Sequence, residues 1–218
     1  MNKAHRLAGL TALAFAHPAS AKAGDVILRA RAIIVAPQES SSGIQPTFPG
    51  EKVKVSNRWA PEVDVTYMLT DNIGFELIAA TTKHHVSGRS GTTGSIGRLA
   101  STWVLPPTLT AQYHFAPDAA VRPYVGAGVN YTIFYSEKAS SGLEGAVGDT
   151  DVSLSNSLGP AIQAGVDLDI GKNLFLNFDA KWVRIRTKAR LNTTALGTER
   201  VKVHIDPLIF GVGIGRRF

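Results

Sequence analysis

Apolar and polar side chains alternate along several segments of this chain, and this pattern constrains the fold more than any other feature. In the segment 59–69 the odd positions are apolar and most even positions are polar. A second such segment, 73–80, follows the turn residues Thr70-Asp71-Asn72. A period of two is the period of a β-strand, and about ten residues suffice for a tilted strand to cross a bilayer. The two segments therefore predict a β-hairpin.

The same pattern predicts eight strands, near 25–35, 59–70, 72–83, 99–115, 122–136, 156–170, 174–187 and 199–218. Short turns at 70–72, 116–120 and 171–173 alternate with longer segments rich in Ser, Gly and Thr at 36–58, 84–98, 137–155 and 188–198. In an up-and-down barrel this alternation puts the tight turns on one rim and the long loops on the other. We therefore predict an all-β fold, an eight-stranded antiparallel up-and-down transmembrane β-barrel over residues 24–218.

Residues 1–23 have the features of a secretory signal peptide. Lys3 and Arg6 precede an apolar segment at 7–16, and small residues follow it. Cleavage after Ala21 or after Ala23 fits the pattern, and we favour Ala23. The 218-residue chain has no cysteine, which excludes disulfides and thiolate metal sites. Without residues 1–23 its charge is nearly balanced, so it lacks the basic footprint of a nucleic-acid-binding protein.

The alternation also fits a soluble calyx with its apolar face inward, so the direction of that face has to be decided. An interior enclosed by eight strands is barely wide enough for side chains. It could not hold the many aromatic residues of the apolar faces, such as Trp103, Tyr131 and Phe210. On the other face, charges of both signs could pair across a narrow lumen. We therefore expect the apolar face to contact lipid. Glycines on the inner face are expected mainly to let bulky inner neighbours approach the wall.

The last strand ends the chain on an aromatic residue, Phe218. A terminal aromatic on an alternating strand is typical of the assembly signal of bacterial outer-membrane barrels. Most such strands carry another aromatic residue two positions earlier, where this chain has Arg216, whose long side chain could reach the lipid headgroups.

The chain resembles the OmpW family of outer-membrane proteins over nearly all of residues 24–218. The matching segments are 61–67, 70–77, 105–109, 112–115, 122–132, 163–167 and 206–207. The resemblance implies an eight-stranded barrel in the bacterial outer membrane with a narrow, largely apolar channel for small hydrophobic molecules. It also implies a constriction at Ile78 and Lys181, and the cation at the second position argues against a fully apolar plug.

These features predict passive passage of a small hydrophobic solute through a monomeric barrel. Apolar loop residues would take it up, namely Ile44, Phe48, Ile96, Leu143 and Val147. Met68, Ile78 and Phe134 would line the outer half of the lumen, above a charged layer that includes Glu76, Asp179 and Lys181. Further expected partners are outer-membrane lipids and lipopolysaccharide, and the barrel-assembly machinery; nucleic acid is not expected.

Four prolines lie in or beside predicted strands: Pro106, Pro107, Pro160 and Pro207. Proline cannot donate to a strand ladder and is normally found at edges or bulges. A closed barrel has no edge, so each proline predicts a bulge or a local opening. A bulge would only shape the wall, whereas an opening would let an apolar solute leave sideways into the lipid.

Two other classes of function remain open: a structural or receptor barrel without flux, and a lipid-modifying barrel enzyme. The enzyme is disfavoured because no Gly-x-Ser-x-Gly elbow accompanies the serines near His84-His85. Adjacent histidines on an extended chain point to opposite sides, so we expect surface histidines and no metal site. Asp167 and Asp169 are expected to pair with Arg29, Arg31 and Arg122. We thus predict neither catalytic residues nor a cofactor.

Overall fold

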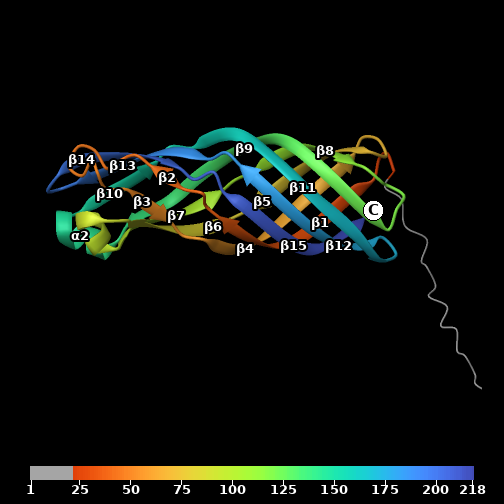
Figure 1. Ribbon diagram of the computed structural model, residues 1–218, viewed down its shortest axis with the longest axis horizontal. Helices are drawn as coiled ribbons and strands as arrows, with labels where there is room; N and C mark the ends of the chain where they lie inside the picture. Colours follow the sequence, from red (N-terminus) through yellow and green to blue (C-terminus); the bar gives the residue numbers. More distant parts are fainter. Residues whose placement is uncertain (1–21) are drawn as a thin grey trace, which may run out of the picture.

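The computed structural model describes residues 22–218. The predicted signal peptide, 1–23, lies outside these residues except for Lys22 and Ala23, and it stays a prediction. Figure 1 shows an elongated barrel with tight turns and the C-terminus at one end. Strands, two short helices and loops extend the barrel at the other end.

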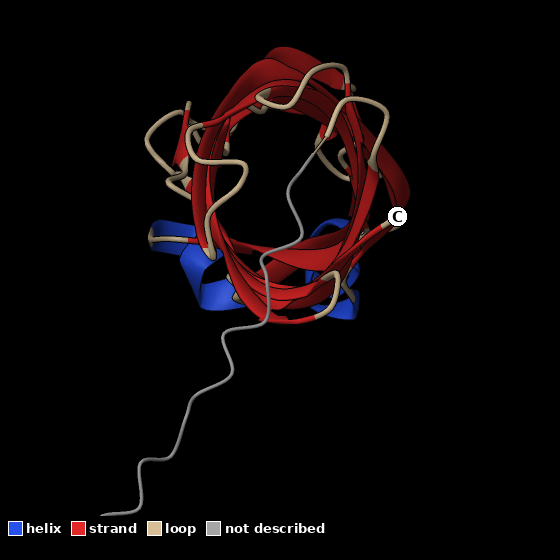
Figure 2. Cartoon of the chain, turned by 90° about the vertical axis from the view of Figure 1, so that its right-hand side faces the viewer, coloured by secondary structure: helices blue, strands red, loops and turns tan. Residues whose placement is uncertain are grey.

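Eight antiparallel strands form a closed ring, which Figure 2 shows from the tight-turn end. Around the ring they are β11, β12, β15, β1, β4, β5, β8 and β9, and a ladder between β9 and β11 closes it. Their bounds are β1 Val26–Ala36, β4 Arg58–Met68, β5 Ile73–Ala80, β8 Thr108–His114, β9 Val121–Ala139, β11 Ser157–Gly171, β12 Leu174–Val183 and β15 Leu208–Arg217. The predicted fold is confirmed, and tight turns follow β4, β8 and β11 as expected.

The predicted long loops are shorter than expected because strands continue into them. The additional elements are β2 Ser40–Ser41, β3 Val53–Val55, β6 Thr82–Gly88, α1 Gly91–Ile96, β7 Arg98–Leu105, α2 Ser141–Val147, β10 Thr150–Leu154, β13 Arg186–Thr193 and β14 Gly197–His204. Together with the last residues of β9 they form what we term the outer extension, at the left of Figure 1. The predicted loop 188–198 is mostly the hairpin β13–β14. Neither helix in residues 22–218 is long and apolar enough to span a membrane.

The apolar face of the barrel points outward. Trp103, Tyr131 and Phe210 are 36%, 47% and 50% exposed. In contrast, Arg29, Arg31 and Glu76 are fully or almost fully buried inside. A soluble calyx would show the opposite arrangement. A closed ladder with an apolar exterior is the form in which strands satisfy their backbone groups in lipid.

Inner-face glycines make room for large neighbours at two positions. A Cβ at Gly165 would lie 2.4 Å from the ring of Tyr124, and one at Gly215 would lie 2.2 Å from the ring of Phe175. Both aromatic rings are buried in the barrel interior. These glycines therefore shape the packing of the interior, as expected, and do not widen a passage.

Candidate functional site

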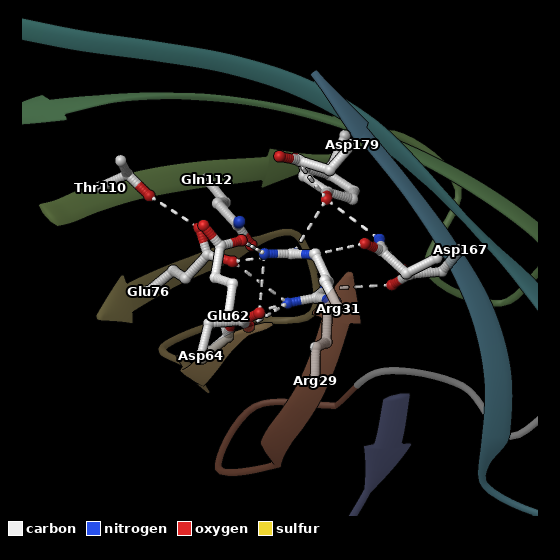
Figure 3. A network of polar contacts seen from close by, with 12 residues as sticks. Arg29, Arg31, Glu62, Asp64, Glu76, Thr110, Gln112, Asp167 and Asp179 are labelled. Atoms are coloured by element: carbon white, nitrogen blue, oxygen red, sulfur yellow. Dashed lines mark hydrogen bonds and ion pairs between the residues drawn. The ribbon is translucent and has the colours of Figure 1, made fainter. Parts of the chain in front are cut away.

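A layer of buried charges crosses the middle of the barrel (Figure 3). Arg29 and Arg31 are two residues apart on β1, so both side chains point inward. Arg29 lies 3.2 Å from Asp64 of β4 and 3.0 Å from Asp167 of β11. Arg31 lies 2.8 Å from Asp64 and 3.3 Å from Glu76 of β5. The ion pairs thus connect strands from several sides of the barrel.

The charged layer continues on β9, β11 and β12. Asp179 accepts a hydrogen bond of 2.8 Å from the Tyr124 hydroxyl, and Glu76 accepts one of 2.6 Å from Gln163. Arg122 lies 2.5 Å from Asp169. Asp167 and Asp169 therefore belong to an ion-pair network, as expected. Paired charges that also hold hydrogen bonds can remain buried in a narrow lumen.

Met68 lies on the tight-turn side of this layer. It is fully buried in a small cluster with Ile27 and Phe175, close to the turn that follows β4. The expectation that Met68 shares the outer half of the lumen with Ile78 and Phe134 was wrong. The reason is the position of Met68 at the last residue of β4, where the inward-facing row of this strand reaches the opposite rim.

A cavity of about 100 Å³ lies on the outer side of the charged layer. Its wall is mostly aliphatic and includes Ile33, Ile78 and Phe134. Glu62 and Lys181 form its polar floor, with Lys181 Nζ 2.5 Å from Glu62 Oε1 and 2.9 Å from Asp179 Oδ1. The remaining predicted channel residues, Glu76 and Asp179, lie within the charged layer beneath this floor.

His84 lies in the wall of the same cavity, so its expected place on the surface was wrong. Its Nδ1 is 2.8 Å from the Ser56 carbonyl and its Nε2 is 2.9 Å from the Thr82 hydroxyl. Because a carbonyl only accepts, Nδ1 carries a proton and donates it. Alternation along β6 directs His84 inward, while His85 stays partly exposed. Within residues 22–218 no cluster of three groups could hold a metal ion.

A second apolar cluster in the outer extension surrounds the outer part of the cavity, and Ile44, Val53 and Val203 belong to both. Ile44, Leu143 and Val147 are buried in it against Leu99 and residues of β3 and β14, while Phe48 and Ile96 pack against its edge. The apolar loop residues named from the sequence therefore contact one another. A solute entering from outside would pass among these side chains.

The barrel wall is interrupted beside the cavity. The β4–β5 ladder ends at Glu62↔Ala80, and in the described chain no ladder pairs residues 58–61 of β4 with β6. A groove of about 360 Å³ opens here on the outside, lined by residues that include Trp59, Ala60 and Thr81. Ala80 lines the cavity, and Thr82 lines both the cavity and the groove. We term this interruption the β4–β6 gap.

These observations describe a transmembrane barrel with an apolar outer cavity and a charged middle, and the comparison with known proteins agrees. The model of the OmpW family matches residues 22–218. The chain belongs to the OmpW family. Outer membrane protein W of Vibrio cholerae is 36% identical over 97% of both chains. The crystal structure of OprG from Pseudomonas aeruginosa superimposes with a TM-score of 0.86, at 33% identity, over 91% of this chain and 98% of that one. This protein is therefore an outer-membrane barrel.

A further relative is named the dibenzothiophene metabolism operon protein PahQ, from Pseudomonas aeruginosa. It is 32% identical over 78% of this chain and 76% of its own length.

Two of the prolines of this OmpW-family barrel adjoin a second interruption of the wall, on the edge of β5 and β6 opposite to the β4–β6 gap. Pro106 and Pro107 lie between β7 and β8. On the side of β5 and β6, the β5–β8 ladder ends at Ile78↔Thr108 and the β6–β7 ladder begins only at Thr82↔Val104, so the residues between these two pairs are not paired with each other. Toward β9 the wall is closed, because Pro107 accepts a hydrogen bond of 3.0 Å from the Tyr131 amide. This second interruption also adjoins the cavity, because Pro106 is part of the cavity wall, whereas neither proline lines the groove at the β4–β6 gap.

The other two prolines mark a bulge that remains bridged. The Arg184 amide donates to Pro160 over 3.0 Å, and the Val183 amide donates to Pro207 over 3.3 Å. The Asp206 carboxylate accepts a hydrogen bond of 3.0 Å from the Ile185 amide. These bonds hold the wall together where β12 passes into β13. At Pro160 and Pro207 the geometry corresponds to a bulge and not to an opening.

Proposed function

We propose that this outer-membrane barrel carries small hydrophobic molecules past the polar outer leaflet and releases them sideways into the bilayer. The observation that carries the proposal is the apolar cavity, which has a charged floor and an interrupted side wall. Such a cavity favours neutral, apolar molecules, because transfer of apolar surface out of water is favourable. An engineered apolar cavity of about 150 Å³ binds benzene, so this cavity suits a small ring after modest widening.

The charged floor argues against passage straight through the barrel. A hydrocarbon crossing it would have to separate Lys181 from Glu62 and the arginines from their carboxylates. Separated buried charges are costly, since each loses its partner without gaining water. The β4–β6 gap lies beside the cavity, and the groove outside it is lined by Trp59 and Trp103 together with Arg58, Lys83 and His85. Since none of these three basic residues forms an ion pair within residues 22–218, leaving through the gap breaks no ion pair.

The relative named for a dibenzothiophene metabolism operon supports this class of solute. Dibenzothiophene is a neutral aromatic compound of low polarity. A relative named for the metabolism of such a compound is consistent with a role in the entry of aromatic solutes, and we extend that role to this chain.

A structural or receptor barrel without flux is the second candidate. It is favoured by the packed apolar cluster around Leu143 and Val147 in the outer extension, because stable packing there would hinder entry. This candidate predicts that the barrel does not accelerate entry of any hydrophobic solute.

Uptake into vesicles tests the proposal. The barrel is reconstituted into vesicles with an outer leaflet of lipopolysaccharide, and the entry of naphthalene is followed by its fluorescence. We expect faster entry with the protein than without it. Ala80→Phe, which fills the cavity, should abolish the gain. Ala79→Phe is the matched control, because this neighbour points to lipid on the same strand. Equal rates with and without the wild-type barrel would contradict the proposal.

A further inference from the structure

The hairpin β13–β14 carries basic residues directly opposite one another. Lys188 pairs with Lys202, and Arg190 pairs with Arg200 in the antiparallel register. All four side chains are exposed on the outer face of the hairpin. Like charges directly across a ladder destabilise a sheet. The hairpin alone therefore provides no reason for this arrangement.

The basic face extends toward the membrane. Arg186 is exposed two residues before Lys188, and Arg184 is exposed two residues earlier still. We term the six residues Arg184, Arg186, Lys188, Arg190, Arg200 and Lys202 the basic patch. The intervening residues Thr187, Val201 and Val203 point into the barrel and are buried. Alternation thus places every cation of the patch on one surface.

Carboxylates do not neutralise the patch. Among residues 22–218, none of its six members lies within 4.0 Å of a carboxylate. Asp151 is at the edge, opposite Asn192 on β13. Asp206 uses one oxygen on the Ile185 amide. Glu199 points inward and is buried, where it accepts from Thr47. The patch therefore keeps a strong positive charge.

The position of the patch relative to the apolar belt indicates its partner. Trp182 lies opposite Leu208 at the outer margin of the lipid-facing surface, and Leu158 is 74% exposed nearby on β11. Arg184 follows Trp182 by two residues on the same outward row. From Arg184 to Arg190 the extended chain covers about 20 Å along its own direction. The patch thus begins at the level of the headgroups and continues outward over the sugar region of the outer leaflet.

We propose that the basic patch binds the phosphate groups of lipopolysaccharide. Guanidinium and ammonium groups form charge-assisted hydrogen bonds with phosphate, and arginine can bind it through two parallel bonds. Phosphates between the facing pairs would turn the repulsion of Lys188 with Lys202 and of Arg190 with Arg200 into attraction. The lipid would then fasten the hairpin, and with it the outer end of the barrel.

Binding and stability measurements on one pair of variants test this proposal. The wild type and Lys188→Gln/Lys202→Gln are purified in detergent and titrated with phosphorylated lipopolysaccharide, its dephosphorylated form, or inorganic phosphate. A basic residue near an anionic lipid surface contributes about fivefold to binding, so the double variant should bind the phosphorylated lipid about 25-fold more weakly. Lys172→Gln, in the exposed turn at the opposite rim, is the control and should bind as the wild type does.

Thermal unfolding shows whether a loss of binding comes from a loss of folding. Without lipid, the double variant should be at least as stable as the wild type, because it removes one repulsive pair. With phosphorylated lipid, the wild type should gain more stability than the variant. Equal binding by the wild type and the double variant would overturn the proposal. The proposal would also be overturned if the wild type bound the dephosphorylated lipid as tightly as the phosphorylated lipid. Binding of free inorganic phosphate as tight as that of the phosphorylated lipid would overturn it as well.

Discussion

Lys181 of β12 and Glu62 of β4 meet inside the barrel, with Nζ 2.5 Å from Oε1, although β15 and β1 stand between their strands in the wall. The pair forms the floor of the apolar cavity and the upper boundary of the charged layer. Its position explains how one narrow lumen combines an apolar outer part with a charged middle.

Removal of the Lys181 charge should destabilise the barrel. In Lys181→Met, Glu62 and Asp179 lose a buried cation, and breaking one side of a buried pair costs about 3 kcal/mol or more. The free energy of unfolding in lipid vesicles, measured by urea titration, should fall by this amount. Lys172→Met changes the same side chain at an exposed position and should leave stability unchanged. Equal stability of Lys181→Met and the wild type would show that these ion pairs do not hold the floor.

A methyl group at Gly165 should disturb the interior. Its Cβ would lie 2.4 Å from the Tyr124 ring and 2.7 Å from the Phe178 carbonyl, so the ring has to shift. Overpacking of this kind costs about 1–3 kcal/mol. Gly165→Ala should therefore lower the urea midpoint. Gly171→Ala adds the same methyl group where nothing lies within 4 Å and is the control. A midpoint shift no larger than that of the control would contradict the packing argument.

Lowering the pH should release α1 from Glu51, which holds the start of this helix. The pKa of Glu51 lies below its usual range because its carboxylate accepts hydrogen bonds from the Thr93 hydroxyl and from the amides of Thr93 and Thr92. The fold thus favours the ionised form. This stabilisation is fully present above the unfolded pKa of about 4.3, and it is lost as the pH falls through the lowered folded pKa.

Amide hydrogen exchange at Thr92 and Thr93 measures this release. In the wild type, local protection should decrease at acid pH after correction for the intrinsic exchange rate. Glu51→Gln should show weaker protection at neutral pH and little further change with acid. A wild type whose protection stays constant below pH 4 would contradict this role of Glu51.

Local patterns in the sequence suffice for the barrel itself. The odd and even positions of 59–69 separate a lipid face from a lumen face, and the turn at 70–72 fixes the first hairpin. The pairing of inward arginines with carboxylates could be predicted from the sequence, because alternation puts Arg29, Arg31 and Asp64 on the same inner surface.

The height of a residue in the lumen was harder to predict. Met68 belongs to the correct face, yet it lies at the wrong end for the cavity, because depth depends on the stagger between neighbouring strands. The inward direction of His84 depends on β6 continuing beyond the membrane. The polar sequence around it resembled a loop.

The β4–β6 gap had no local signal at all. Ala60 and Thr81 look like ordinary strand residues, and the lack of a ladder between them follows from where β4 and β6 diverge. Proline gave a signal only for the second interruption: Pro106 and Pro107 lie where β5 and β6 lack pairs with β7 and β8, whereas Pro160 and Pro207 lie at a bridged bulge.

Sideways release is the central claim, and a cross-link across the β4–β6 gap tests it most directly. The natural chain has no cysteine, so Ala60→Cys/Thr81→Cys can be joined by a short bifunctional thiol reagent without a background reaction. The control is Val63→Cys/Ala79→Cys, a lipid-facing pair in the intact β4–β5 ladder. Naphthalene entry into the lipopolysaccharide-coated vesicles is measured before and after cross-linking. We predict that the first cross-link abolishes the acceleration given by the barrel and that the control cross-link leaves it intact. Unchanged entry through a barrel fully cross-linked between positions 60 and 81 would contradict the account.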